Sequence, residues 1–272
     1  MQIQRDFLCA GPERGGVHPP HDLTRGGNSK GRMLPESLFS SARIMYRRYS
    51  HAMGRKVSPF SLYEEEKVIF VHIPKNAGTF VNSIIYPSMS PEESTKINAH
   101  HSVQYLRRLN RKTFDELPKM AILRHPAERL RSAFDYLKFK SPFVPDRAFA
   151  DKALAAYPDF ETFCRTVEDD EFKELLNWLH FQPQVSFICT DRGEIRVDAL
   201  TSLEHLETGL RCIGEQFGFD WSLVQRPSSK IEPNGSVQDI IDRYYASDLA
   251  LWDAVDCAPQ KCLFFPKHAR AA

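Results

Sequence analysis

The sequence predicts an α/β fold, a parallel sheet flanked by helices in one domain, and three observations predict it. Val68–Val71 and Met120–Leu123 are short apolar runs without interruption, typical of strands buried on both faces of a parallel sheet. A polar loop follows each run, and apolar residues at helical spacing follow each loop. Strand, loop and helix repeated in this order indicate the α/β class.

The elements follow in chain order from these patterns. After the first strand, Phe80, Val81, Ile84 and Ile85 share one face of a predicted helix. Further elements are predicted by the same periodicities: a helix from Pro126 to about Lys138, strands at Val185–Cys189 and Ile195–Val197 around a turn at Asp191–Gly193, and helices at Leu203–Phe217, Val237–Tyr245 and Ser247–Val255.

The length of 272 residues suits one large domain. We predict that domain over residues 67–265, preceded by a flexible basic arm at residues 1–60. Leu38–Met53 has the pattern of a short basic amphipathic helix, which docks on the core or, alternatively, contacts a membrane surface. The arm carries ten lysines and arginines against four acidic residues, although the whole chain has a formal net charge of only +1. That total argues against a nucleic-acid-binding protein.

The chain lacks the roughly 18 consecutive apolar residues of a membrane-spanning helix. It also lacks a secretory leader, so we expect a cytoplasmic protein, with peripheral membrane contact left open. The six cysteines are scattered without a C-x-x-C pair, and we expect mostly free thiols. The alternative is a local bridge between Cys257 and Cys262.

The loop after the first predicted strand has the properties of an anion site. Backbone N–H groups at the start of a helix point to one place, where the helix dipole also favours negative charge. Gly78 permits close approach of the backbone, Thr79 is expected to cap the helix, and Lys75 adds a full charge. The G-x-x-x-x-G-K-[ST] motif of nucleoside triphosphate sites is absent from the sequence. An ordinary strand–helix turn remains the alternative.

The second predicted strand ends in a further anion-binding pattern. Arg124 follows the strand, and Ser132 lies eight residues later on the next helix. A guanidinium group binds phosphate in a bidentate manner, and a hydroxyl adds a donor. Ligands of open α/β sheets bind at the carboxyl ends of the strands. Two neighbouring anion sites there predict a ligand with two phosphate groups.

These two segments resemble the nucleotide motifs of the family 2 carbohydrate sulfotransferases, which include heparan sulfate 2-O- and chondroitin 4-O-sulfotransferases. Val68–Thr79 is similar to their phosphosulfate-binding loop, and Ile122–Phe134 to their 3′-phosphate-binding motif. His180–Gln184, Leu203–Leu206 and Tyr244 are weaker matches. The lack of a membrane anchor favours a bacterial member.

The resemblance implies a P-loop-like fold and 3′-phosphoadenosine 5′-phosphosulfate (PAPS) as co-substrate, without a metal. It implies in-line transfer of a sulfuryl group to a hydroxyl of a carbohydrate or other alcohol. Lys75 would neutralise the leaving phosphate, and His100 or, less favoured, His101 would be the general base. The implied donor-binding residues are Pro74, Lys75, Asn76, Ala77, Gly78, Thr79, Phe80, Arg124, Ser132 and, on a looser match, Lys230.

Two other functions stay open on the sequence alone: a P-loop nucleotide or metabolite kinase, and a non-catalytic nucleotide-binding module. The kinase would normally show the missing G-K-[ST] and an acidic metal ligand. The acceptor is not identified, although basic residues in Leu137–Pro158 would attract an anionic polysaccharide.

Overall fold

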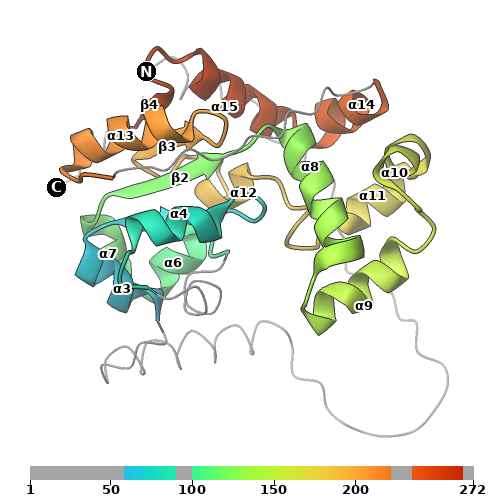
Figure 1. Ribbon diagram of the computed structural model, residues 1–272, viewed down its shortest axis with the longest axis horizontal. Helices are drawn as coiled ribbons and strands as arrows, with labels where there is room; N and C mark the ends of the chain where they lie inside the picture. Colours follow the sequence, from blue (N-terminus) through green and yellow to red (C-terminus); the bar gives the residue numbers. More distant parts are fainter. Residues whose placement is uncertain (1–57, 90–99, 222–234, 266–272) are drawn as a thin grey trace, which may run out of the picture.

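The computed structural model describes residues 58–89, 100–221 and 235–265. A four-stranded sheet lies at its centre, with helices on either side (Figure 1). The predicted basic arm, apart from its last three residues, and the predicted helix at Leu38–Met53 lie outside the described residues. The prediction of a single mixed α/β domain is confirmed.

The sheet has the order β1-β2-β3-β4, formed by β1 (Ile69–Val71), β2 (Lys119–Leu123), β3 (Ala199–Ser202) and β4 (Cys262–Phe264). β1 pairs in parallel with β2, and β2 with β3, whereas β4 runs antiparallel to β3. All residues of the first three strands are buried, as the unbroken apolar runs of β1 and β2 predict. The carboxyl ends of β1 and β2 therefore lie side by side.

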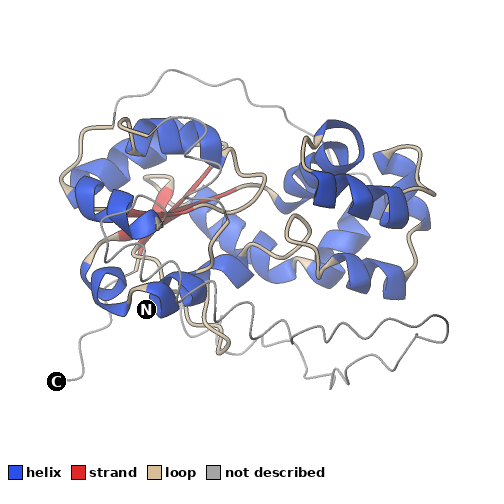
Figure 2. Cartoon of the chain, turned by 90° about the horizontal axis from the view of Figure 1, so that it is seen from below, coloured by secondary structure: helices blue, strands red, loops and turns tan. Residues whose placement is uncertain are grey.

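The described helices divide between two hydrophobic clusters. Those around the sheet are α3 (Pro59–Glu66), α4 (Gly78–Ile85), α6 (Val103–Leu109), α7 (Arg111–Glu116), α12 (Val185–Ile188), α13 (Leu206–Phe217) and α15 (Ala246–Cys257). The second cluster joins α8 (Pro126–Asp135), the π-helix η1 (Tyr136–Lys140), α9 (Val144–Ala153), α10 (Phe160–Thr166), α11 (Asp169–Leu175) and α14 (Gly235–Tyr244). Figure 2 shows the strands on one side of the molecule and this helical group on the other.

Helix α3 precedes the predicted start of the domain at residue 67. Its Phe60 and Tyr63 are fully buried in the cluster around the sheet, and Ser58 caps the helix by accepting from the Phe60 N–H. Core packing thus includes Phe60, which was assigned to the flexible arm, and Tyr63, which lies between the arm and the predicted domain.

The prediction of a strand at Val185–Cys189 is wrong. Val185–Ile188 forms the helical turn α12, and only Cys189 makes an isolated bridge, with Ile195. The reason is a tertiary contact: both carboxylate oxygens of Asp248, on α15, accept the N–H groups of Gln184 and Val185 at 2.7 and 2.9 Å. A carboxylate at a helix N-terminus stabilises the turn over the extended form that Val and Ile favour locally.

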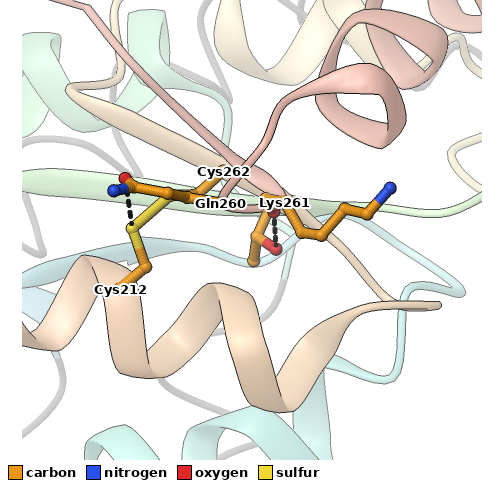
Figure 3. Close-up of a disulfide and its surroundings, with 5 residues drawn as sticks. Cys212, Gln260, Lys261 and Cys262 are labelled. Atoms are coloured by element: carbon orange, nitrogen blue, oxygen red, sulfur yellow. Dashed lines mark hydrogen bonds between the residues drawn. A yellow bond between two sulfur atoms is a disulfide. The ribbon is translucent and has the colours of Figure 1, made fainter.

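The cysteines also depart from expectation. Cys212 of α13 forms a disulfide with Cys262 of β4, 50 residues away (Figure 3). The bridge proposed between Cys257 and Cys262 is therefore wrong, and Cys257, Cys164 and Cys189 are free. Pairing across the α13–β4 contact depends on the packing of α13 beside the sheet, which cysteine spacing does not reveal.

We predict that Gly209→Ala destabilises the protein, because α13 packs closely on β3 at this residue. A Cβ there would lie 1.8 Å from Thr201 Oγ1, and that hydroxyl donates to the Lys261 carbonyl at 2.8 Å. Overpacking of this kind costs about 1 to 3 kcal/mol, measurable by urea unfolding. The control is Gly235→Ala on α14, where a Cβ has open space within 4 Å. Equal unfolding midpoints for both variants would contradict the expected contact.

Candidate functional site

The loop between β1 and α4 adopts a conformation that non-glycine residues rarely take. Lys75 and Ala77 have φ angles of 68° and 58°, in the left-handed region, where each such residue costs on the order of 1 kcal/mol or more. Two buried contacts hold this shape. Arg129 Nε donates to the Pro74 carbonyl at 3.0 Å, and Asn76 Nδ2 donates to the Ile122 carbonyl of β2 at 2.7 Å.

The side chain of Asn76 points beneath the loop rather than toward a ligand. Its Nδ2 also donates to Gln184 Oε1 at 2.7 Å, and the residue is 1 % exposed. Its Oδ1 has no hydrogen-bond partner among the described residues. Asn76 therefore fastens the loop to β2, and only its backbone remains for the predicted anion site.

Helix α4 starts differently from the prediction for Thr79. The N-cap is Ala77 without a side-chain hydrogen bond, so the expected capping by Thr79 is wrong. The left-handed residue Ala77 ends the loop, and the helix begins at Gly78, which leaves Thr79 exposed in the first turn. Phe80 follows, half-buried. The N–H groups of this first turn remain available as anion donors.

Position 78 requires glycine for a second reason, besides the close approach of the backbone to an anion. A Cβ at this position would lie 1.9 Å from His72 Cδ2, and His72 is itself buried between Phe70 and His100, with ring centroids 5.9 and 4.5 Å away. The glycine thus allows the His72 ring to lie directly under the start of α4.

Arg124 meets the same loop from the end of β2. Its Nη1 donates to the Lys75 carbonyl at 3.3 Å, and its Nε lies 3.4 Å from Glu128 Oε2 on α8. The two strand ends expected to present neighbouring charges do so, because β1 and β2 are adjacent and parallel. Ser132 lies two turns further along α8 and is half-buried.

Lys75 is a poorly solvated cation. Its Nζ lies 3.7 Å from the ring centroid of Tyr136, a cation–π contact with an aromatic ring of η1. Burial, together with the charges of Arg124 and Lys140, lowers the pKa of Lys75 to about 8. A site where like charges gather without full neutralisation favours a bound anion.

His100 lies between two other histidines. Its ring is 4.5 Å from that of His72 and 5.8 Å from that of His180. Burial, reinforced by His72 and His180, holds the pKa of His100 well below its usual value, so the imidazole is neutral at pH 7. Its Nδ1 lies 3.3 Å from the His72 carbonyl. If Nδ1 donates to that carbonyl, Nε2 keeps its lone pair and can accept a proton.

His101 has a different environment. It is half-exposed, and its ring packs on Tyr105 at 4.7 Å. Contacts between rings instead connect His100 to Lys75: His180 lies 4.9 Å from Tyr136, and Tyr136 carries the Lys75 ammonium on its face. The geometry thus brings Lys75 and His100 into one site, whereas the ring of His101 packs on Tyr105 of α6.

Three side chains at this site were not expected as functional residues. His180 is 6 % exposed, and its Nε2 lies 3.5 Å from Asp146 Oδ2; burial lowers its pKa to about 4. The sequence did point to His180, through the weak family match at His180–Gln184. Tyr136 lay in the helix predicted from Pro126 to about Lys138, and Asp146 in the stretch Leu137–Pro158, whose basic residues alone were considered, so neither was singled out.

The remaining predicted donor contact, Lys230, lies outside the described residues. Within the described ranges, no group of three or more histidine, cysteine or acidic side chains is arranged to hold a metal ion. In the same ranges, no helix has the length and apolar character needed to cross a bilayer.

The family model described as "Sulfotransferase family" matches residues 58–241. The chain belongs to this family. Neither a curated protein nor a solved structure matches the chain at a significant level. The match covers both strand-end loops, the histidine cluster and Gln184, so it contains the whole site described above.

Family membership makes the protein a sulfotransferase, which moves a sulfuryl group to a hydroxyl-bearing acceptor. The kinase and the non-catalytic module considered from the sequence are not favoured by this match. Lys75 and Arg124 thus place two half-buried cations at the ends of β1 and β2, and the imidazole of His100 beside His72 is neutral at pH 7.

We predict that Gly78→Ala destabilises the sulfotransferase by about 1 to 3 kcal/mol, because the added methyl group overlaps the buried His72 ring. Urea unfolding of Gly78→Ala, His72→Ala and the double variant measures the coupling. The double variant should lose less stability than the sum of the two single losses, since removing the imidazole makes room for the methyl group. Strictly additive losses would argue against the overlap.

Proposed function

We propose that this sulfotransferase transfers the sulfuryl group of PAPS to a hydroxyl of a carbohydrate acceptor, with His100 as general base. Lys75 supports this proposal most strongly. It is a half-buried ammonium group with a lowered pKa, in a left-handed loop before a helix N-terminus, 3.7 Å from the ring of Tyr136. A cation held in this way is suited to a leaving phosphate.

The donor-binding residues follow from the loop. The backbone of Pro74, Asn76, Ala77 and Gly78, together with Thr79 and Phe80, would surround the 5′-phosphosulfate in a P-loop-like manner.

Arg124 and Ser132 would hold the 3′-phosphate, with Lys230 as a further contact. In the described state Arg124 is paired with Glu128, so phosphate binding would compete with this carboxylate for the guanidinium.

The reaction needs one proton transfer and one substitution at sulfur. The acceptor O–H loses its proton to His100 Nε2 while its oxygen forms a bond to sulfur. The bond between sulfur and the 5′-phosphate oxygen breaks, and Lys75 neutralises the charge left on that oxygen. Because the charge moves over a short distance in a buried site, positioning and electrostatic stabilisation account for most of the rate.

We expect label transfer from radioactive PAPS to a panel of glycans to depend steeply on both residues. Lys75→Ala should lower kcat/KM by about 10² to 10³, through loss of leaving-group stabilisation. His100→Ala should lower kcat by about 10² to 10⁴, through loss of the base. His101→Ala is the matched control and should retain activity within about tenfold of the wild type.

The proposal fails if the protein does not bind the 3′-phosphorylated nucleotide. A larger loss in His101→Ala than in His100→Ala would leave the donor assignment intact and move the base to His101.

The pKa of Lys75 predicts a pH dependence of donor binding. Because the pKa in the free protein is about 8, below the 10.5 of an exposed lysine, the ammonium charge is lost between about pH 7 and pH 9. The affinity for adenosine 3′,5′-bisphosphate, measured by calorimetry, should therefore fall as pH rises through this window. Lys75→Arg keeps its charge and should bind with a flat profile over the same range. Parallel profiles for the two proteins would exclude Lys75 as the titrating group.

A further inference from the structure

A cluster of exposed apolar side chains lies next to the site. Among the described residues, the exposed large hydrophobic side chains include Phe139, Phe143 and Val144, with 60 %, 53 % and 68 % of their surface exposed. Only two others, Leu179 and Phe264, reach this class, at 36 % and 38 %. Pro142 and Pro145 are exposed in the same stretch. We call residues 139–145 the apolar turn. Such a concentration of apolar surface marks an interaction site.

The apolar turn is held in shape by buried contacts beneath it. Ser141 Oγ donates to Asp146 Oδ2 at 2.8 Å, and the Phe143 N–H donates to Ser141 Oγ at 3.2 Å. Arg147 Nη1 donates to the Pro142 carbonyl at 2.6 Å. These contacts fix the backbone, so that Phe143 and Val144 project outward at the start of α9. The exposure is therefore built into the fold.

The exposed charges at and near the apolar turn are mostly basic. Lys140, Arg147 and Lys152 are exposed there, against one exposed carboxylate, Asp151. The other carboxylate of this stretch, Asp146, is buried and bonded to Ser141. An apolar tip with a basic rim complements the surface of a bilayer that contains anionic lipids. The side chains of phenylalanine, valine and proline offer no hydrogen-bonding groups to the hydroxyls of a glycan.

The apolar turn is also directly connected to the candidate site. It continues η1, whose Tyr136 carries the Lys75 ammonium, and the charge of Lys140 acts on Lys75. Helix α9, in which the turn ends, lies at the lower edge of the helical group, away from β3 and β4 (Figure 1). This position allows the turn to reach a surface without obstruction from the sheet.

We propose that the apolar turn docks the protein on an anionic membrane surface and brings the hydroxyl group of a membrane-borne acceptor to the site. The docking does not depend on the donor. The acceptor class, a hydroxyl carried by a lipid headgroup, rests on the proposed function.

The test is co-sedimentation of the full chain with vesicles, without donor. We expect binding to vesicles of phosphatidylcholine with one third phosphatidylglycerol, and weaker binding to phosphatidylcholine alone. The Phe143→Ser/Val144→Ser variant should lower the partition coefficient on anionic vesicles at least about tenfold, because burial of these apolar groups drives insertion. Phe264→Ser is the control. It replaces an exposed aromatic residue in the same way, but on β4, on the sheet side of the molecule (Figure 1).

Three results would overturn the proposal: no binding to anionic vesicles, equal binding by the wild type and the turn variant, or an equal loss in the control. Equal binding would assign membrane attachment to the basic residues before residue 58. If the wild type bound no vesicles but had a molecular mass that rose with concentration, and only the turn variant lost this rise, the apolar turn would be a contact between two copies of the chain. Transfer to soluble glycans without vesicle binding would reject this inference alone, whereas absence of nucleotide binding would reject the proposed function.

Discussion

The side-chain amide of Gln184 fixes the distance between the two strand-end loops, and the rest of the site depends on it. Its Oε1 accepts from Asn76 Nδ2 at 2.7 Å and from the Arg124 N–H at 3.0 Å, while its Nε2 donates to the Arg124 carbonyl at 2.9 Å. Gln184 is fully buried, and Asp248 in turn accepts its backbone N–H. Because an unpartnered buried amide costs about 1 to 3 kcal/mol, these bonds define one arrangement of the two loops.

This arrangement explains how a chain with a net charge of +1 presents a cationic site. Arg129 is 2 % exposed and donates to the Pro74 carbonyl, and Arg124 lies beside Glu128. Lys75, by contrast, places its ammonium group over the ring of Tyr136, and burial lowers its pKa to about 8. The charge that lacks compensation is therefore concentrated on the residue at the centre of the loop. Total charge is uninformative here, because in the proposed function the local placement of three cations would determine what binds.

The sequence predicted those parts of the structure that depend on local patterns. β1, β2 and the helices after them follow from apolar periodicity, and the pairing of their loops follows from parallel neighbours. The features that were missed depend on contacts between distant residues. Asp248 stabilises the helical turn α12, whose first residue, Val185, lies 63 positions before it in the chain. Cys212 meets Cys262 only because α13 packs beside β4. The loop conformation at Ala77, rather than any residue preference, moved the start of α4 away from a Thr79 cap.

The site also lies where the two hydrophobic clusters meet, and this position links its two titrating groups, the Lys75 ammonium and the His100 imidazole. Lys75 and His72 come from the sheet side, whereas Tyr136, Asp146 and His180 come from the helical group. Exclusion of water between the clusters lowers the pKa of Lys75 and of His100 together. A bound dianion would reverse both shifts, since negative charge favours the protonated forms. In the proposed reaction the donor would thus complete the charge of Lys75 and strengthen His100 as a base, so that both groups reach their working state only when there is a sulfuryl group to transfer.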